Sequence, residues 1–221
     1  MTLALFDLDN TLLAGDSDHA WGDFLVNEGV VDAEAFRKAN DEFHQQYMNG
    51  ELDIQAYLQF AFRPLTENSM EKLSVLRKRF METIIEPMVL GQGLELIRRH
   101  REEGHTLVII TATNRFVTEP IAARLGIANL IATEPEMKDG AFTGYLSGTP
   151  CFQEGKITCL EAWLETHDES ADGAWFYSDS HNDLPLLKRV SQPVAVDPDT
   201  KLRAEALSSG WPIISLRSAG N

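Results

Sequence analysis

The run Thr106-Leu107-Val108-Ile109-Ile110-Thr111 decides the fold of this chain. Between its two threonines every residue is aliphatic, without the apolar and polar alternation that marks a strand with one wet face. Continuous apolar strands are typical of parallel sheets whose two faces are both covered by helices. The run therefore predicts a central parallel strand, and residues 3–8 predict a second short buried strand.

Helical and strand-like patterns alternate around this run. Helices are predicted at residues 93–103, 115–125, 155–165, 183–189 and 199–208. Strands are predicted at residues 129–134, 174–178, 194–196 and 212–215, and a small hairpin at residues 136–147 turns at Asp139-Gly140. This alternation predicts an α/β fold with a doubly wound, Rossmann-like parallel sheet.

One long stretch does not follow the alternation. Helices are predicted at residues 18–28, 32–48, 53–62 and 69–85, with no strand between them. We interpret residues 16–88 as a small helical domain inserted after the first strand, and call it the cap segment. Residues 1–15 and 89–221 are then expected to form the catalytic core.

The amino-acid composition narrows the range of possible functions. Of the 221 residues, 43% are hydrophobic, which is ordinary for a globular protein, and the formal net charge is -15. Such acidity argues against nucleic acid or an anionic membrane as a partner, because both attract lysine and arginine. An anionic substrate would have to be attracted locally, by a divalent metal and a lysine.

Other features indicate the compartment. The amino terminus lacks the basic lead and long apolar stretch of a secretion signal, and no window approaches the roughly twenty apolar residues of a membrane span. Cys151 and Cys159 fit neither a zinc site nor a CxxC pair, and we interpret them as free thiols. We expect a cytoplasmic protein, and the sequence gives no indication of its oligomeric state.

Asp7 and Asp9 follow the first predicted strand, in the stretch Asp7-Leu8-Asp9-Asn10-Thr11. Ligands of a doubly wound sheet bind at the carboxyl ends of its strands, and residues two apart on an extended chain face one side. The two carboxylates are suited to hold a divalent cation, or to serve as nucleophile and general acid. The alternative is a capped turn without chemistry.

Two further features lie at the same predicted edge. Thr111 ends the apolar run, where its hydroxyl and the backbone N–H groups of the next helix start would suit a phosphate oxygen, or would form a plain N-cap. Lys156 begins a predicted helix, where it is either solvated or a neutraliser of phosphate charge.

A second carboxylate pair follows the strand at residues 174–178, in the stretch Ser178-Asp179-Ser180-His181-Asn182-Asp183. Taken alone, this stretch is as consistent with a solvated loop as with a site. His181 is expected to be a solvated loop histidine.

In this order, the four motifs resemble those of the haloacid dehalogenase superfamily, and the resemblance covers essentially the whole chain, including the helical insertion. It is strongest to the subgroup that contains phosphoserine phosphatase. The resemblance implies a phosphatase that forms a phospho-aspartate and uses Mg²⁺. Asp7 would be the nucleophile, and Asp9 would protonate the leaving alcohol and then deprotonate water.

The resemblance also implies roles for the remaining positions. Mg²⁺ would be held by Asp7, the backbone carbonyl of Asp9, and Asp179. Thr111, Lys156 and Asn182 would contact the phosphoryl group. Asp183 would orient a metal-bound water or Lys156.

The cap segment departs from the phosphoserine pattern at two positions. Asp16 stands where that group has a glutamate for the substrate amine. Gln59 stands where it has an arginine for the substrate carboxylate, although Arg63 lies one helical turn later. A neutral amide cannot form a charged fork with a carboxylate, which favours an aminated ester without one.

L-Histidinol phosphate, an intermediate of histidine biosynthesis, fits these departures best. Asp16 and Asp18 would meet its ammonium and imidazole groups, and His19 or Trp21 would stack on its ring. The alternative for Trp21 is a core position in the first cap helix. Rival interpretations of the whole chain are a phosphoserine or sugar-phosphate phosphatase, a phosphotransferase or mutase, and a catalytically silent binding module.

Overall fold

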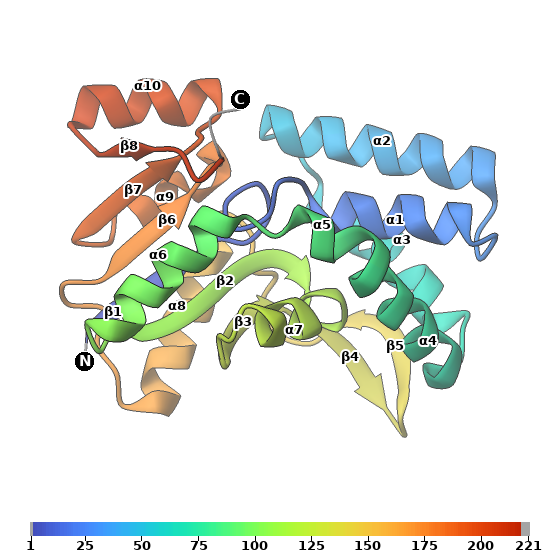
Figure 1. Cartoon of the computed structure of the whole chain (residues 1–221). Coiled ribbons are helices and arrows are strands. Elements are labelled where there is room, and N and C mark those ends of the chain that lie inside the picture. The colour runs from blue at the N-terminus through green and yellow to red at the C-terminus, as the bar shows by residue number, and fades with distance from the viewer. Residues whose placement is uncertain (1, 218–221) are drawn as a thin grey trace.

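A computed structural model describes residues 2–217. Its centre is a six-stranded sheet in the order β3-β2-β1-β6-β7-β8, in which every neighbouring pair is parallel (Figure 1). The strands are β1 (Leu3–Phe6), β2 (Thr106–Asn114), β3 (Asn129–Thr133), β6 (Trp175–Ser178), β7 (Gln192–Val196) and β8 (Ile213–Ile214). The predicted α/β fold with a parallel sheet is confirmed.

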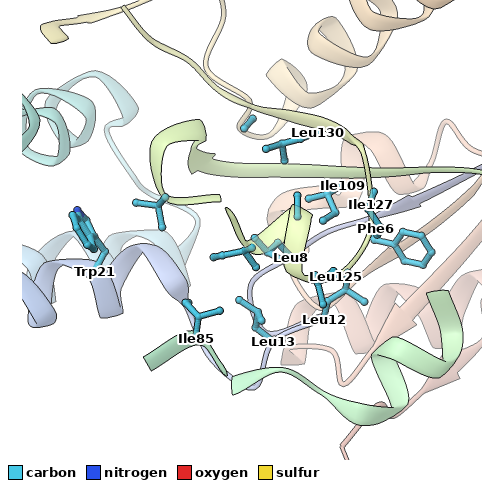
Figure 2. Close-up of a cluster of buried hydrophobic side chains, with 14 of the residues drawn as sticks. Phe6, Leu8, Leu12, Leu13, Trp21, Ile85, Ile109, Leu125, Ile127 and Leu130 are labelled. Atoms are coloured by element: carbon cyan, nitrogen blue, oxygen red, sulfur yellow. The ribbon is translucent and has the colours of Figure 1, made fainter. Parts of the chain in front are cut away.

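Helices cover both faces of this sheet because alternate residues of each strand point in opposite directions. In β1, Ala4 and Phe6 belong to one buried apolar cluster, and Leu3 and Leu5 belong to the other. The first cluster includes residues of α6 (Gly91–Glu102) and α7 (Arg115–Arg124); Figure 2 shows part of it. The second includes residues of α8 (Glu154–His167), α9 (Leu184–Leu187) and α10 (Thr200–Ser209).

The cap segment contains four longer helices before the chain returns to the sheet. They are α1 (Ser17–Asn27), α2 (Ala33–Asn49), α3 (Ile54–Thr66) and α4 (Met70–Phe80), followed by a π-helical turn (Met81–Ile85) and the short α5 (Glu86–Met88). The chain leaves and re-enters the core at adjacent points, where Leu13 and Val89 form an antiparallel bridge. The domain division at 15/16 and 88/89 stays a prediction, and its outermost residues, 1 and 218–221, lie outside the described range.

A small hairpin stands apart from the main sheet, as predicted. Its strands, β4 (Pro135–Lys138) and β5 (Ala141–Leu146), are antiparallel and turn at Asp139 and Gly140, both of which have positive φ. Figure 1 shows the hairpin beside the cap helices rather than beside the central strands. Within residues 2–217, the helices are all too short or too polar to cross a bilayer.

Two local predictions differ from the structure. The strand predicted to end at Thr111 continues to Asn114, with an irregular register against β3. Asn114, not Thr111, caps the next helix, and its side chain accepts a hydrogen bond from the N–H of Val117. The predicted helix at 183–189 is a 3-10 turn (His181–Asp183) followed by the short α9.

Candidate active site

Asp7 stands at the centre of the carboxyl edge, immediately after β1. It is 5% exposed, and its Oδ1 lies 2.8 Å from Nζ of Lys156, which enters from the first turn of α8. The ammonium of Lys156 also lies 2.7 Å from Oδ1 of Asp183, which accepts a second hydrogen bond from Ser178. The structure thus brings Asp7, Lys156 and Asp183 into one buried group, as expected from the sequence.

Neighbouring charges and burial shift the pKa values of this group in opposite directions. Burial alone would lower the pKa of Lys156, but the carboxylates of Asp183 and Asp7 outweigh it and raise that pKa. Burial raises the pKa of Asp7 to about 6, although the Lys156 ammonium acts in the opposite direction. Asp7 is therefore a carboxylate kept ionised by its cationic partner rather than by water.

Asp179 approaches Asp7 through a shared hydroxyl. Thr11 Oγ1 lies 3.2 Å from Oδ2 of Asp7 and 3.2 Å from Oδ1 of Asp179, and it accepts a hydrogen bond from the Asp179 N–H. Burial, and then the charge of Asp7, raise the pKa of Asp179 well above its usual value. Two crowded carboxylates of this kind would be stabilised in their ionised form by a cation.

The donor set at this point suits magnesium. Asp7 and Asp179 offer hard carboxylate oxygens, which Mg²⁺ prefers, and no thiol or imidazole takes part in the contacts described above. Among residues 2–217, the group of three metal-ligand side chains whose ligand atoms all lie within 4.8 Å of one another is His100, Glu103 and His105. Nδ1 atoms of its two histidines lie 2.7 Å apart, the distance of a hydrogen bond between the rings.

Asp9 is held by two groups that the sequence analysis did not assign. Its Oδ1 accepts a hydrogen bond from the N–H of Ser17 at 2.6 Å, and its Oδ2 accepts one from the Thr113 hydroxyl at 2.8 Å. Burial, and then the charge of Asp16, raise the pKa of Asp9 well above its usual value. A carboxyl group that favours its proton in this way is suited to act as a general acid. Thr113 was detectable, since it lies two residues after Thr111 and shares its side of the strand.

A cavity lies between this edge and the cap segment. The core lines it with Asp7, Asp9, Thr111, Ala112, Thr113 and Phe152. The cap segment lines it with Asp16, Asp18, His19, Asn40, Phe43, His44, Tyr47, Leu52, Ile54 and Tyr57. The cavity volume of about 50 Å³ has room for about four waters.

Two acids face this cavity from α1 and its N-terminus. Asp16 caps the helix by accepting from the N–H groups of Asp18 and His19, and its Oδ2 lies 3.3 Å from Nδ1 of His44. Asp18 accepts a short hydrogen bond from the Tyr57 hydroxyl. Burial, and then the charge of Asp16, raise the pKa of Asp18 to about 7. Of these two acids, Asp18 is therefore the one that lacks a cationic partner within the described residues.

Histidine and amide groups of the cap segment complete the polar lining. The His19 ring stacks on the His44 ring with centroids 4.6 Å apart. Asn40 Nδ2 lies 2.9 Å from Nδ1 of His19 and donates to the carbonyl of the same residue. Asn40 and His44 were missed, although Asn40, His44 and Tyr47 recur every three or four residues along α2.

The structure does not bring two of the predicted substrate residues to the cavity. Trp21 is 4% exposed and packs against Phe24, Phe80 and Phe116, so the core alternative is correct; Figure 2 shows it at the edge of the apolar cluster. Gln59 is exposed and lies outside the cavity lining.

Arg63 does not replace Gln59 as a carboxylate reader. Its guanidinium is exposed and paired with Glu67 at 2.8 Å, along the same helix. It lines a separate surface hollow, with Phe36 and Phe60 among its neighbours. Neither Gln59 nor Arg63 therefore lines the cavity, and the correspondence of this helix to the carboxylate-binding part of the phosphoserine group stays a prediction.

The loop after β6 also differs from expectation. Asn182 is buried and donates from Nδ2 to the carbonyl of Tyr47, while its Oδ1 accepts from Gln153. It is engaged with the cap segment and is not part of the cavity lining. His181 is not a solvated side chain, because its Nδ1 lies 2.7 Å from Oδ2 of Asp199 and only 12% of its side chain is exposed.

The remaining cysteine prediction is confirmed, since Cys151 and Cys159 are both free.

Carboxylates gathered around one buried lysine at the carboxyl edge of a doubly wound sheet define a hydrolase that handles phosphoryl groups. The haloacid dehalogenase-like hydrolase model matches residues 4–188, and this chain belongs to that family.

Relatives agree with this membership. A histidinol-phosphatase of Neisseria meningitidis serogroup C is 43% identical over 219 residues, which cover 97% of this chain and 99% of the relative. The phosphoserine phosphatase SerB1 of Mycobacterium tuberculosis is 31% identical, over 98% of this chain and 71% of its own length. The chain is a phosphoric monoester hydrolase of the haloacid dehalogenase type.

Solved structures show the same fold. A protein of unknown function from Bordetella pertussis Tohama I superposes with a TM-score of 0.93 at 40% identity, covering 98% of this chain and all of that one. A substrate-bound phosphoserine phosphatase superposes with a TM-score of 0.71 at 18% identity, over 98% of this chain and 93% of that one. At 18% identity the second likeness concerns the fold alone.

Proposed function

We propose that this chain is a Mg²⁺-dependent phosphomonoesterase that acts through a phospho-aspartate at Asp7 on an amine-bearing ester without a carboxylate. The best candidate substrate is L-histidinol phosphate. One observation carries the choice of substrate: the cavity that contains Asp7 and Asp9 is also lined by Asp16 and Asp18, and its lining from the described residues includes no arginine or lysine.

Charge favours this substrate over phosphoserine. Phosphoserine carries a carboxylate, which is best bound by an arginine fork. Asp18 is half-buried and is hydrogen-bonded by Tyr57 but not paired with a cation, so it would instead gain from a substrate ammonium, because an opposite charge favours the ionised carboxylate. Asp18 is therefore the proposed amine contact, with Asp16 beside it and already paired with His44.

The lining of the cavity also favours histidinol phosphate. Phe43, Tyr47, Tyr57 and Phe152 give the cavity an aromatic wall, which suits a flat imidazole ring better than a sugar. The relative named histidinol-phosphatase matches over nearly the full length of both chains. A role in histidine biosynthesis would agree with the cytoplasmic location expected from the sequence, which stays a prediction.

In the first step, a carboxylate oxygen of Asp7 attacks phosphorus and the ester P–O bond breaks. The leaving alkoxide oxygen takes the proton of Asp9, whose pKa is raised by burial and by the charge of Asp16. The hydrogen bonds that Asp9 accepts from Ser17 and Thr113 orient its carboxyl group. Lys156 neutralises charge on Asp7 and on the phosphoryl oxygens. Thr111 lines the cavity beside them.

In the second step, the Asp9 carboxylate takes a proton from water as that water attacks phosphorus. The bond between phosphorus and Asp7 breaks, which releases inorganic phosphate and restores both aspartates. Asp7, the backbone carbonyl of Asp9, and Asp179 would hold Mg²⁺, which supplies Lewis-acid neutralisation of the phosphoryl charge. Asp183 keeps Lys156 in place through its two short contacts.

Phosphate release over a panel of esters tests the proposal. The panel contains histidinol phosphate, phosphoserine, a sugar phosphate and a nucleotide, each with Mg²⁺ and with EDTA. We expect Mg²⁺-dependent release with a preference for histidinol phosphate. A preference for phosphoserine would refute the substrate assignment and leave the chemistry standing. Release only in the presence of an acceptor alcohol would indicate a phosphotransferase, and no release from any ester would indicate a binding module.

A further inference from the structure

The C-terminal end of α2 is fastened to the core at three points. Its last carbonyls lack partners within the helix and carry the negative end of the helix dipole. Asn182 donates to the carbonyl of Tyr47 at 3.0 Å, and Nζ of Lys201 donates to the carbonyl of Asn49 at 2.7 Å. The third point is Gly50, which lies against His181. We call Tyr47–Gly50 the docking end of α2.

Lys201 and His181 form the outer part of this contact. Nδ1 of His181 lies 2.7 Å from Oδ2 of Asp199, and Nζ of Lys201 lies 3.4 Å from Nε2 of the same ring. The Lys201 ammonium thus bridges the imidazole of the core and the Asn49 carbonyl of the cap segment. A cation is the favoured partner for a helix C-terminus.

Gly50 fits this arrangement for two reasons. It closes α2 with φ of 77°, a left-handed conformation that favours glycine. A Cβ at this position would also lie 2.6 Å from Nε2 of His181. Gly29 follows α1 with a similar φ of 67°, but a Cβ there would meet nothing within 4 Å. The two glycines share the backbone requirement, and only Gly50 has the close approach to the core.

The docking end carries a wall of the reaction cavity. Tyr47 lines that cavity and packs against Phe152 with ring centroids 6.0 Å apart. Its pKa is raised by burial and then by the nearby charge of Asp7. Tyr47 therefore reaches the catalytic carboxylates from the cap segment, and its backbone is held by the loop that follows Asp179.

We propose that Lys201 and His181 are positioning residues that dock the end of α2 on the core and so set Tyr47 as the wall that closes the reaction cavity. The inference rests on the proposed function only in taking this cavity as the reaction site. Lys201 and His181 then control how tightly a substrate is enclosed, without touching it.

Hydrogen exchange of the full-length protein tests the contact directly. Lys201→Met and Gly50→Ala are each expected to accelerate amide exchange in residues 44–52 about fivefold. Gly29→Ala is the matched control, since it pays the same backbone cost without a collision, and it should leave exchange in residues 44–52 unchanged. Equal exchange in Lys201→Met and in the unmodified protein, or an equal effect of both glycine variants, would overturn the proposal.

Kinetics distinguish positioning from plain stability. With p-nitrophenyl phosphate and Mg²⁺, Lys201→Met and Gly50→Ala are expected to raise KM about fivefold, with kcat changed less than twofold. Lys201→Arg should restore KM, because it keeps a cation within reach of the Asn49 carbonyl. A loss of kcat at constant KM would contradict the proposal. The exchange readout needs no substrate, so it stands even if histidinol phosphate is not hydrolysed.

Discussion

Nζ of Lys156 lies 2.8 Å from Oδ1 of Asp7, with both side chains buried where the first strand ends. Asp7 and Lys156 lie about 150 residues apart in the sequence, so the pair exists only in the folded protein. The same ammonium neutralises Asp183. One cation thus balances two buried carboxylates, and its loss should affect both stability and catalysis.

Replacing Lys156 by methionine should therefore be costly. The change leaves Asp7 and Asp183 buried without a cation, which is expected to lower the free energy of unfolding by about 3–5 kcal/mol and kcat by about 10³-fold. Urea denaturation and phosphate release measure the two effects. Lys188→Met is the control, because the Lys188–Glu205 pair is largely exposed and should contribute about 1 kcal/mol or less. Similar losses in the two variants would refute the assignment of Lys156.

Asp7→Asn tests the nucleophile. An amide cannot form the phospho-aspartate, so kcat should fall by roughly 10⁴-fold or more, and acid-quenched enzyme should carry no covalent phosphate. Circular dichroism is expected to remain unchanged, since the amide has nearly the same shape. Asp172→Asn, in the exposed loop before β6, serves as the matched control. Retained turnover with an unchanged melting temperature would show that another group attacks phosphorus.

Asp18→Asn tests whether Asp18 binds the substrate amine. The variant keeps the shape of the cavity but loses the charge, so KM for histidinol phosphate should rise about tenfold. The KM for p-nitrophenyl phosphate, which has no amine, should change less than about twofold. Steady-state kinetics with the two esters decide the matter. If both KM values rose equally, Asp18 would be supporting the cap segment rather than contacting an ammonium.

The Asp16–His44 pair predicts a pH dependence of stability. The hydrogen bond that His44 donates to Asp16 raises the pKa of His44 above 6.5, so its contribution is present below that value and is lost as pH rises through the folded-state pKa. Burial would raise the pKa of Asp16, but hydrogen bonds from His44 and the His19 N–H lower it below 3.8. That contribution is present above 3.8 and is lost as pH falls through the lower folded-state pKa.

The variant His44→Gln removes the pair. Its deficit in unfolding free energy, relative to the unmodified protein, should be larger at about pH 5.5 than at about pH 8.5. His167→Gln, at the exposed end of α8, is the control and should show no such difference. Denaturation at the two pH values measures the deficit. A deficit that grows with pH would mean that His44 is not held in its charged form.

The core was predictable because its physical signals are strong and local. Each central strand is buried on both faces, so the run at residues 106–111 differs clearly from a helix or an edge strand. Asp7, Thr111 and Asp179 were found because parallel strands bring their carboxyl ends to one edge. The positions of these residues follow from the strand assignments alone, without knowledge of side-chain contacts.

The cap segment was less predictable because the sequence of a helix does not show which neighbour each of its faces contacts. Trp21 and Asp18 lie three residues apart on α1, yet Trp21 packs among phenylalanines and Asp18 faces the cavity. Gln59 was assigned by likeness to another group, but the rotation of α3 places it on the exposed side. A polar and aromatic stripe at three- and four-residue spacing on α2 was the signal that would have found Asn40 and Tyr47.

The strand order has a consequence for synthesis of the protein. β1 pairs with β2 and β6, so Leu3 meets Thr106 and Ala4 meets Trp175 only after most of the chain exists. Pairing over such separations is entropically costly and slow. On a ribosome, the first-made strand must therefore wait, unpaired, while the cap helices emerge and fold locally. Asp7 is translated well before Lys156 and Asp179, so a nascent chain that stops before these residues has no active phosphatase centre.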